Sequence, residues 1–437
     1  MRPAPLLIGL VLGLAALTIV LMVATRDNAT LLALIWGGLL AAAAMDLLSS
    51  ISSRNLALEA DLSESGFTGM SVPLTATLST RKGNLPAALE VRLSLDHGLK
   101  TARTTTLTPG PGTTKIRFNI PLELRKRGTM QVKYLAARYA SRFGLFEILP
   151  KWQLNRVIAS LPNIHPVLNG DIQARMLPLM DGMKTTNMRG EGAEFHQLRD
   201  FVAGMDPRTL DWKRSARMNT LVARETRAER NHQIMICVDS GHLMAERIGK
   251  LAKLDHAINA ALALTWAGAL GGDNIGFYSF DSTPGQMIAP RSGRTAFARI
   301  RAACADLRES PAETNHTLAM THLHSKLSRR SLVVIFSDFV DSVTAELLIE
   351  NMAVITRQHL VLYVALRDRA IEDISRPETL SMQSIAQAIS AAQIKQERAS
   401  VLDRLRRLGV HCIDTNPENL TADLVSRYID IKMQGLI

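Results

Sequence analysis

The sequence predicts a membrane-anchored chain: two N-terminal transmembrane helices, then an antiparallel β-sandwich, then a doubly wound α/β domain. Three observations predict this fold class. Two apolar runs open the sequence, apolar and polar residues then alternate with period two, and strand and helix patterns alternate from about residue 233. The chain has 437 residues, 47% of them hydrophobic, which is enough for several buried cores.

Residues 1–55 contain the two apolar runs. Residues 5–25 have roughly the 20 residues that a helix needs to cross a bilayer, and residues 31–48 follow after a short polar segment. A cleaved signal peptide is the alternative for the first run, but no clear small-x-small cleavage site precedes the second. Arg2 and Arg54 flank the hairpin, which predicts a bacterial-type inner (plasma) membrane location with the bulk of the chain cytoplasmic.

Residues 56–165 predict the β-sandwich. Segments such as SVPLTATLST and TMQVKYLAARYA alternate apolar with polar residues, and turn-forming segments such as RKGN and TPGPGT separate them. Residues 233–437 predict the α/β domain, because continuous apolar strands such as QIMICVD and SLVVIFSDF alternate with helical patterns. Such strands are expected in a parallel sheet that helices cover on both faces. Residues 166–232 form a charged linking region between these two domains.

Composition limits the function classes. The formal net charge of +11 is compatible with nucleic acid, an anionic membrane surface or acidic partners. The three cysteines, Cys237, Cys304 and Cys412, are far apart and predict buried thiols in a reducing compartment. The sequence contains neither GxxxxGK[ST] nor GxSxG, which excludes a P-loop ATPase and removes the commonest signal of a serine hydrolase.

Two acids end predicted strands of the α/β domain. Asp239 ends QIMICVD and Asp338 ends SLVVIFSD, and ligands bind at the carboxyl ends of strands in open α/β sheets. The pair is suited to a divalent cation such as Mg²⁺, held through oxygen ligands and waters. The alternative is that each acid caps the helix that follows it.

The most charged part of the chain, residues 190–230, lies in the linking region. From Arg189 to Arg230 there are nine Lys and Arg against seven Asp and Glu, an excess of two, so we expect no nucleic-acid binding. We expect the acids Glu194, Asp206 and Asp211 to pair with the bases Arg199, Arg208, Lys213 and Arg217, and the aromatic rings of Phe195 and Trp212 to be buried against a neighbouring domain. Structural docking, partner binding and catalysis remain open as roles.

This stretch, GEGAEFHQLRDFVAGMDPRTLDWKRSARMNTLVARETRAER, followed at once by the strand IMICVD, closely resembles the signature of the domain of unknown function 58 (DUF58) family. The motif positions that we single out as structural or partner-binding are Gly190, Glu191, Glu194, Phe195, Arg199, Asp206, Arg208, Asp211, Trp212, Lys213, Ala216 and Arg217. The resemblance implies a two-helix membrane anchor, a β-sandwich and a C-terminal von Willebrand factor type A-like (vWA-like) domain. It also implies work with a MoxR-type AAA+ ATPase in assembling or activating other proteins.

The vWA comparison shows a departure from the metal-ion-dependent adhesion site, which begins with Asp-x-Ser-x-Ser. Read from Asp239, Gly241 and Leu243 stand where the two hydroxyls belong. Thr314 or Thr317 is the candidate for the later threonine ligand, and Asp338 matches the later acid. The site is therefore degenerate, and we expect at most weak Mg²⁺ binding.

We hypothesise a membrane-anchored, non-catalytic scaffold or adaptor. Its predicted partners are a MoxR-type AAA+ ATPase, an unknown client protein and the lipid bilayer. The alternative is a Mg²⁺-dependent hydrolase or metal-dependent adhesion protein that uses Asp239 and Asp338.

Overall fold

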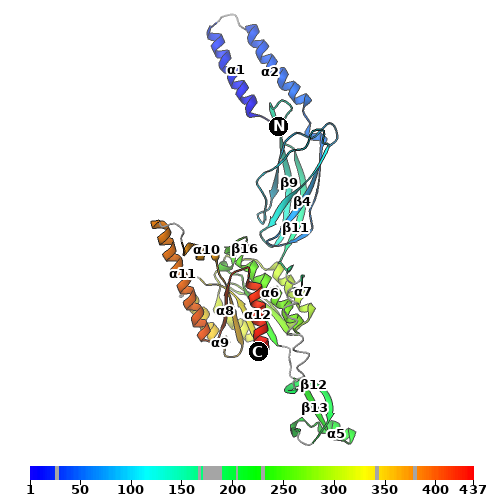
Figure 1. Cartoon of the computed structure of the whole chain (residues 1–437), viewed down its shortest axis with the longest axis vertical. Helices are drawn as coiled ribbons and strands as arrows, with labels where there is room; N and C mark the ends of the chain where they lie inside the picture. Colours follow the sequence, from blue (N-terminus) through cyan, green and yellow to red (C-terminus); the bar gives the residue numbers. More distant parts are fainter. Residues whose placement is uncertain are drawn as a thin grey trace. The chain divides into compact units, whose positions relative to one another are not determined.

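The computed structural model of the chain describes residues 1–24, 29–165, 169–170, 189–202, 205–227, 232–339, 344–376 and 381–437. The chain comprises two compact units, Met1–Leu161 and Pro162–Ile437 (Figure 1). The linking region predicted at 166–232 is described only in part, and residues 171–188 within it lie outside the described residues.

The first unit begins with two apolar helices, α1 (Pro5–Ala24) and α2 (Ala29–Ser49). Both are long and apolar enough to cross a membrane. The short strand β1 (Arg2–Pro3), which precedes α1, pairs with β10 (Phe146–Ile148) of the same unit. The start of the helical hairpin therefore returns to the sheet that follows it in sequence.

The end of α2 is attached to the same part of the sheet by Asp46. This single acid of the second apolar run is fully buried. Its carboxylate accepts hydrogen bonds from the hydroxyl of Ser141, from the backbone N–H of Phe143 at 2.8 Å and from that of Leu145 at 3.2 Å. A buried carboxylate is tolerated only when it is hydrogen-bonded, so this acid serves to fasten α2.

The rest of the first unit is the β-sandwich. Its further strands are β2 (Leu56–Asp61), β3 (Ser65–Phe67), β4 (Ser71–Thr80), β5 (Leu89–Leu95), β6 (Leu99–Lys100), β7 (Thr105–Leu107), β8 (Lys115–Leu124), β9 (Gly128–Ala140) and β11 (Lys151–Leu161). One sheet has the order β2-β4-β8-β6, and the other is built around β9, which pairs with β5, β10 and β11. All pairs are antiparallel except β3 with β11.

Strand β4 illustrates why these segments form a sandwich. Val72, Leu74, Ala76 and Leu78 are buried, and the residues between them point away from the core. Successive side chains of a strand point to opposite faces, so the period-two pattern gives each sheet one apolar face. The apolar faces of the two sheets share one hydrophobic core.

The second unit contains the α/β domain. Its strands are β14 (Gln233–Asp239), β17 (Asn274–Phe280), β18 (Pro284–Ser292), β19 (Leu332–Phe336), β20 (Leu360–Leu366) and β21 (His411–Thr415), with the short pair β15 (Arg247–Ile248) and β16 (Leu251–Ala252). Its helices are η3 (His242–Ala245), α6 (Lys253–Leu270), α7 (Arg294–Asp306), α8 (His316–Lys326), α9 (Thr344–Ile355), α10 (Arg369–Ile374), α11 (Met382–Arg407) and α12 (Leu420–Met433).

The main sheet has the order β18-β17-β14-β19-β20-β21. Five strands are parallel, and β18 at the edge is antiparallel to β17. The sequence analysis did not predict β18. Its residues PGQMIAPRS include two prolines and a glycine, which an edge strand tolerates and which hide the strand pattern.

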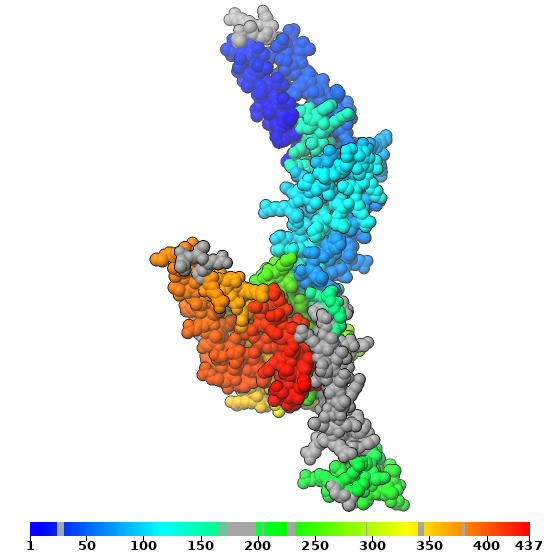
Figure 2. All heavy atoms as spheres, in the orientation of Figure 1, coloured from blue at the N-terminus to red at the C-terminus, as the bar shows by residue number. Residues whose placement is uncertain are grey.

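Helices cover both faces of this sheet. Met235 and Cys237 of β14 belong to one core together with residues of α8, α9 and α11. On the opposite face, Ile234 packs close to Gly268 of α6. Figure 2 shows α11 in orange and α12 in red at the surface of this unit. The predicted architecture, with its two N-terminal helices, β-sandwich and doubly wound α/β domain, is confirmed.

Residues that precede the main sheet form a two-stranded sheet of their own, which we call the arm. Strands β12 (Arg189–Asp200) and β13 (Val222–Arg227) pair antiparallel. Their connection carries the short helices η2 (Pro207–Thr209) and α5 (Trp212–Met218). The arm therefore contains most of the charged motif.

Candidate functional site

The candidate site lies at the carboxyl edge of the main sheet, between β14 and β19. The next strand in the chain after β14 is β17, which lies on one side of β14, whereas β19 lies on its other side. The strand order therefore reverses between β14 and β19. Asp239 is the last residue of β14, and Asp338 follows β19 by two residues. The structure thus brings both acids to the topological switch point, where open α/β sheets bind ligands.

Asp239 is buried, and its carboxylate accepts three hydrogen bonds. Ser337 donates its hydroxyl to Oδ2 at 2.6 Å. The other oxygen, Oδ1, accepts the hydroxyl of Thr314 at 2.7 Å and the backbone N–H of Gly241 at 2.8 Å. Burial raises the pKa of Asp239, and these three hydrogen bonds oppose the rise. The carboxylate is therefore held by neutral donors within the chain.

The surroundings of Gly241 explain why no hydroxyl stands at this position. A Cβ atom at Gly241 would lie 2.0 Å from Oγ1 of Thr314 and 3.1 Å from Oδ1 of Asp239. A serine at position 241 therefore clashes unless Thr314 moves. The hydroxyl of Thr314 occupies the space in which the first serine of an Asp-x-Ser-x-Ser motif would place its side chain.

Thr317 and Leu243, the other two candidate positions, make no hydrogen bond to Asp239 within the described part of the chain. Thr317 lies on α8, and its hydroxyl accepts a hydrogen bond from Nδ2 of Asn351 on α9 at 3.0 Å. Of the two candidate threonines, only Thr314 contacts Asp239 within the described part of the chain. Leu243 lies in η3 and lines a cavity beside the site.

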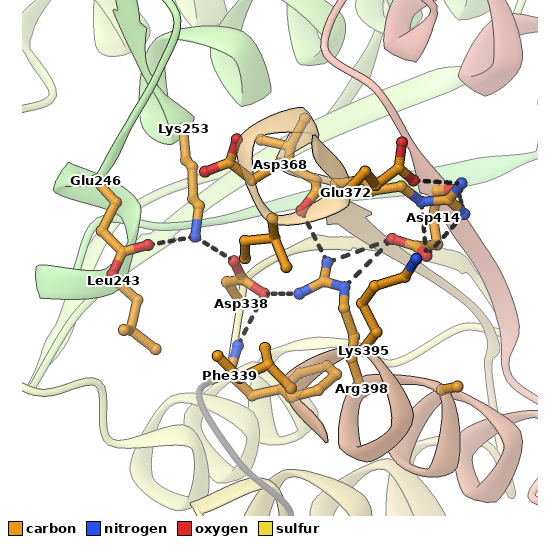
Figure 3. A pocket seen from close by; sticks show the side chains of 15 residues that line it. Leu243, Glu246, Lys253, Asp338, Phe339, Asp368, Glu372, Lys395, Arg398 and Asp414 are labelled. Atoms are coloured by element: carbon orange, nitrogen blue, oxygen red, sulfur yellow. Dashed lines mark hydrogen bonds and ion pairs between the residues drawn. The ribbon is translucent and has the colours of Figure 1, made fainter. Parts of the chain in front are cut away.

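Asp338 is buried and is bound by two cationic side chains (Figure 3). Nζ of Lys253 lies 2.6 Å from Oδ2 of Asp338, and Arg398 donates from Nη1 to Oδ1 at 2.7 Å. Lys253 also contacts Glu246 at 2.6 Å, and Arg398 lies 3.4 Å from Asp414. These five residues form one continuous network of alternating charges.

Sequence reasoning missed both cations of this network. Burial lowers the pKa of Lys253, but Asp338 and Glu246 outweigh that effect, so the pKa is raised overall and the ammonium stays charged. Burial likewise lowers the pKa of Arg398, and Asp338 and Asp414 raise it overall. Lys253 is the first residue of α6, where the helix dipole disfavours a cation. A lysine at that position of an apolar helix is the signal that could have revealed it, whereas Arg398 gives no comparable signal among the charges of α11.

A cavity of about 440 Å³ opens at this network. Figure 3 shows Lys253, Asp338 and Arg398 along it, with α10 and α11 contributing further side chains. Its lining residues are Leu243, Glu246, Lys253, Asp338, Phe339, Leu366, Arg367, Asp368, Ile371, Glu372, Ile394, Lys395, Arg398, Ala399 and Asp414. The cavity therefore combines apolar walls with charges that are largely paired with one another.

These residues do not fit a magnesium ion. Mg²⁺ needs about six oxygen ligands in octahedral geometry, but the oxygens of Asp239 accept three hydrogen bonds and those of Asp338 contact an ammonium and a guanidinium. The described residues contain no group of three or more His, Cys, Asp or Glu side chains that is placed to hold a metal ion. Lys253 and Arg398 supply the positive charge that a cation would bring, so the geometry supports neither weak Mg²⁺ binding nor the hydrolase alternative.

The acids of the charged motif have other partners than those predicted. The carboxylate of Asp206 accepts the backbone N–H of Arg208 at 2.9 Å and caps η2. Asp211 accepts the backbone N–H of Arg214 at 3.1 Å, caps α5, and pairs with Arg224 at 3.3 Å. Among the described residues, neither acid forms an ion pair with the predicted bases Arg199, Arg208, Lys213 and Arg217, so these predicted pairs are wrong. Unpaired N–H groups at helix starts attract the carboxylates instead.

The predicted burial of Trp212 is also wrong. Trp212 is the first residue of α5, and its side chain is 71% exposed. Of the remaining motif positions, Arg199, Arg208, Lys213, Ala216 and Arg217 are exposed. Gly190, Glu191, Glu194 and Phe195 lie on β12, and their side chains lie outside the described residues.

The fold and the site define a doubly wound α/β domain in which the acid that follows β19, Asp338, is paired with a lysine and an arginine of the same domain. Residues 197–398 match the model of the family described as "Protein of unknown function DUF58". The resemblance to the DUF58 family is thereby confirmed over this segment, which extends from the arm to Arg398 of the charge network.

The similar curated proteins are mycobacterial. The uncharacterized proteins Mb1516 of Mycobacterium bovis and Rv1480 of Mycobacterium tuberculosis are each 26% identical to this chain over 191 residues. The match covers 43% of this chain and 59% of each relative, so the chain spans about 59% of the length of the curated relatives it matches.

Two solved structures show distant similarity. The conserved hypothetical protein BatB from Bacteroides thetaiotaomicron is 10% identical with a TM-score of 0.30, over 46% of this chain and 99% of that one. The proximal thread matrix protein 1 from the mussel byssus, with a zinc-occupied MIDAS motif, is 9% identical with a TM-score of 0.30, over 46% of each chain. Similarities at this level carry no functional argument.

Proposed function

We propose that this chain is a membrane-anchored, non-catalytic adaptor that presents the cavity at the carboxyl edge of its α/β sheet to a protein partner. The observation that carries the proposal is the network of Lys253, Asp338 and Arg398. Their charges are paired with one another at 2.6 and 2.7 Å. Groups paired in this way hold the shape of a surface and leave no free base or nucleophile among them.

The cavity has features of a protein-binding surface. Its volume of about 440 Å³ accommodates several side chains. Ile371 on α10 and Ile394 on α11 supply apolar contact area, and Arg367 and Glu372 lie at the same cavity. A surface that combines apolar contact area with charged groups is typical of protein interfaces.

We propose a MoxR-type AAA+ ATPase as this partner, acting together with a client protein. The DUF58 resemblance implies an association with such an ATPase. The sequence contains no P-loop motif, so P-loop ATP hydrolysis in the complex would be the work of another chain. We further propose that α1 and α2 cross the plasma membrane with Arg2 and Arg54 on the cytoplasmic side. A C-terminal alkaline phosphatase fusion is then inactive, and an active fusion contradicts this orientation.

Affinity purification of the tagged full chain from detergent-solubilised membranes tests the adaptor function. We compare Ile371→Asp, inside the cavity, with Ile374→Asp, which lies on the same helix outside it and is 45% exposed. The proposal predicts that an AAA+ ATPase co-purifies with the native chain and with Ile374→Asp in at least one of three conditions: without nucleotide, with ADP or with an ATP analogue. Recovery of the ATPase should fall at least tenfold with Ile371→Asp, because the contact would then have to bury a charge among apolar side chains.

Two results contradict the proposal. One is that no ATPase co-purifies under any nucleotide condition. The other is equal recovery with Ile371→Asp and with the native chain, which would place the contact elsewhere.

A further inference from the structure

Between residues 198 and 224 of the arm, two of the three acids cap helices and the bases are exposed, which the count of charges in the sequence does not reveal. Over residues 198–224 there are six Lys and Arg and three Asp. Asp206 and Asp211 cap the two helices of the arm, and Asp211 also pairs with Arg224. The side chain of Asp211 is only 13% exposed, whereas that of Arg224 is 56% exposed. Asp211 is therefore held within the arm, whereas the six bases of this stretch are exposed.

Helix α5 presents two of these bases outward. Ser215 is buried and points into the arm. Its hydroxyl accepts the backbone N–H of Val222 at 2.9 Å and donates to the backbone carbonyl of the same residue. With about 100° per residue, Lys213 and Arg217 lie on the side of α5 opposite to Ser215. Both are exposed, and neither makes an ion pair with any residue that the structure describes.

Large apolar side chains are exposed on the same small element. Trp212 is 71% exposed, Met218 58% and Leu221 51%. These three residues belong to α5 and the turn that follows it, which form part of a compact body drawn in green in Figure 2. These exposed side chains offer apolar contact area to a partner beside the charged residues of α5.

We infer that α5 and the turn to Leu221 form a docking surface for an acidic, leucine-containing segment of a partner protein. Charge complementarity fixes the acidic character of the partner, because Lys213 and Arg217 have no partner among the described residues. Trp, Met and Arg are the residue types enriched at protein interfaces. A helix of seven residues is too short to lie in a membrane as an amphipathic anchor, and a single exposed aromatic residue on α5 offers no stacking platform for successive bases.

This surface is distinct from the cavity, and the inference does not depend on the adaptor function. The full chain in phosphatidylcholine nanodiscs is titrated with the peptide (Glu-Glu-Leu)₄ and with its uncharged counterpart (Gln-Gln-Leu)₄. Trp212 provides the signal, because its emission shifts to the blue when it is covered, and Trp212→Phe identifies its share among the four tryptophans of the chain.

The test variant is Lys213→Glu/Arg217→Glu. The matched control is Arg299→Glu/Arg301→Glu, which makes the same charge change at two exposed positions of α7. We expect the acidic peptide to bind the native chain and the control equally, and to bind the test variant at least about tenfold more weakly. Binding should weaken with added salt. The Ile371→Asp variant should bind like the native chain.

Three results overturn the inference: equal binding of the acidic and uncharged peptides, equal loss in test and control variants, or loss with Ile371→Asp. Phosphatidylglycerol vesicles and a single-stranded oligonucleotide are titrated in parallel. If either of these, and not the peptide, depends on Lys213 and Arg217, the partner is not an acidic protein segment. Amide hydrogen exchange of β13 in the test variant verifies that the arm stays folded. If the reversal of both charges unfolds the arm, Lys213→Gln/Arg217→Gln, which only removes the charges, replaces it.

Discussion

Lys253 and Asp338 meet at 2.6 Å at the switch point of the α/β sheet, where open α/β sheets bind ligands. The lysine side chain is 10% exposed and the aspartate 4%, so both charges lie inside the protein. Breaking a buried pair costs more than breaking a surface pair, because an uncompensated charge remains behind. This contact therefore bears on both the stability of the domain and the chemistry of its site.

The first prediction concerns Lys253. Lys253→Met leaves Asp338 with Arg398 as its one charged partner, so we expect the α/β unit to lose about 2 kcal/mol of stability, less than a fully broken buried pair. Lys395→Met is the control, because Lys395 is exposed and makes no ion pair with a described residue. Thermal unfolding of the detergent-solubilised chain measures both. Equal midpoints for the two variants would show that the pair is not a structural contact.

The second prediction concerns the space at Gly241. Gly241→Ser restores the hydroxyl of a metal-site motif, but its Cβ meets Thr314, so we expect a loss of about 1–3 kcal/mol, as for other overpacked positions. The double variant Gly241→Ser/Thr314→Ala removes the obstructing hydroxyl and should regain part of that loss. The backbone at Gly241 has φ −66°, which any residue adopts, so the effect is steric. Independent, additive losses in the double variant would contradict this explanation.

The third prediction concerns the attachment of α2. Asp46→Ala leaves the N–H groups of Phe143 and Leu145 without their acceptor, and a buried unsatisfied group costs about 1–3 kcal/mol. We expect hydrogen exchange in the turn between β9 and β10 to become at least tenfold faster in nanodiscs. Ser49→Ala, one turn away on α2, should leave exchange unchanged. Full protection in Asp46→Ala would mean that the turn is held by other contacts.

The fourth prediction concerns pH. His359 is 5% exposed, both of its ring nitrogens lack a hydrogen-bond partner among the described residues, and burial, followed by the nearby His324, lowers its pKa below 6.5. The unfolded chain then binds this proton more readily than the folded one, so stability falls as the pH falls below about 6.5. Hydrogen exchange of β20 between pH 7.5 and 5.5, corrected for the intrinsic pH dependence of exchange, measures the slope. His359→Leu should flatten it and the exposed control His97→Leu should not; an unchanged slope in His359→Leu assigns the dependence to other groups.

Local patterns predicted most of the fold because each element buries its own face. The alternation of β4 and the continuous apolar residues of β14 are both consequences of which faces are covered. Strand β18 was missed because an edge strand needs little apolar surface and admits proline. The capping roles of Asp206 and Asp211 were missed because a count of charges does not say which backbone groups compete for them.

The candidate site was predictable only in part. Asp239 and Asp338 could be placed at one edge because the first ends a strand of a parallel sheet and the second follows another such strand by two residues. Lys253 and Arg398 could not be assigned to Asp338, because they lie 85 and 60 residues away from it in the chain and meet it only through tertiary packing. The exclusion of a serine at Gly241 likewise depends on the position of Thr314, which no spacing reveals.

Calorimetric titration of the detergent-solubilised full chain with Mg²⁺ and with Mn²⁺ tests the central claim most directly. The claim is that neutral donors already engage the carboxylate oxygens of Asp239, and that Lys253 and Arg398 engage those of Asp338. It predicts no saturable heat for either ion up to millimolar concentrations. Saturable binding that Asp239→Ala or Asp338→Ala abolishes would contradict it, because the site would then hold a metal ion despite its own cations.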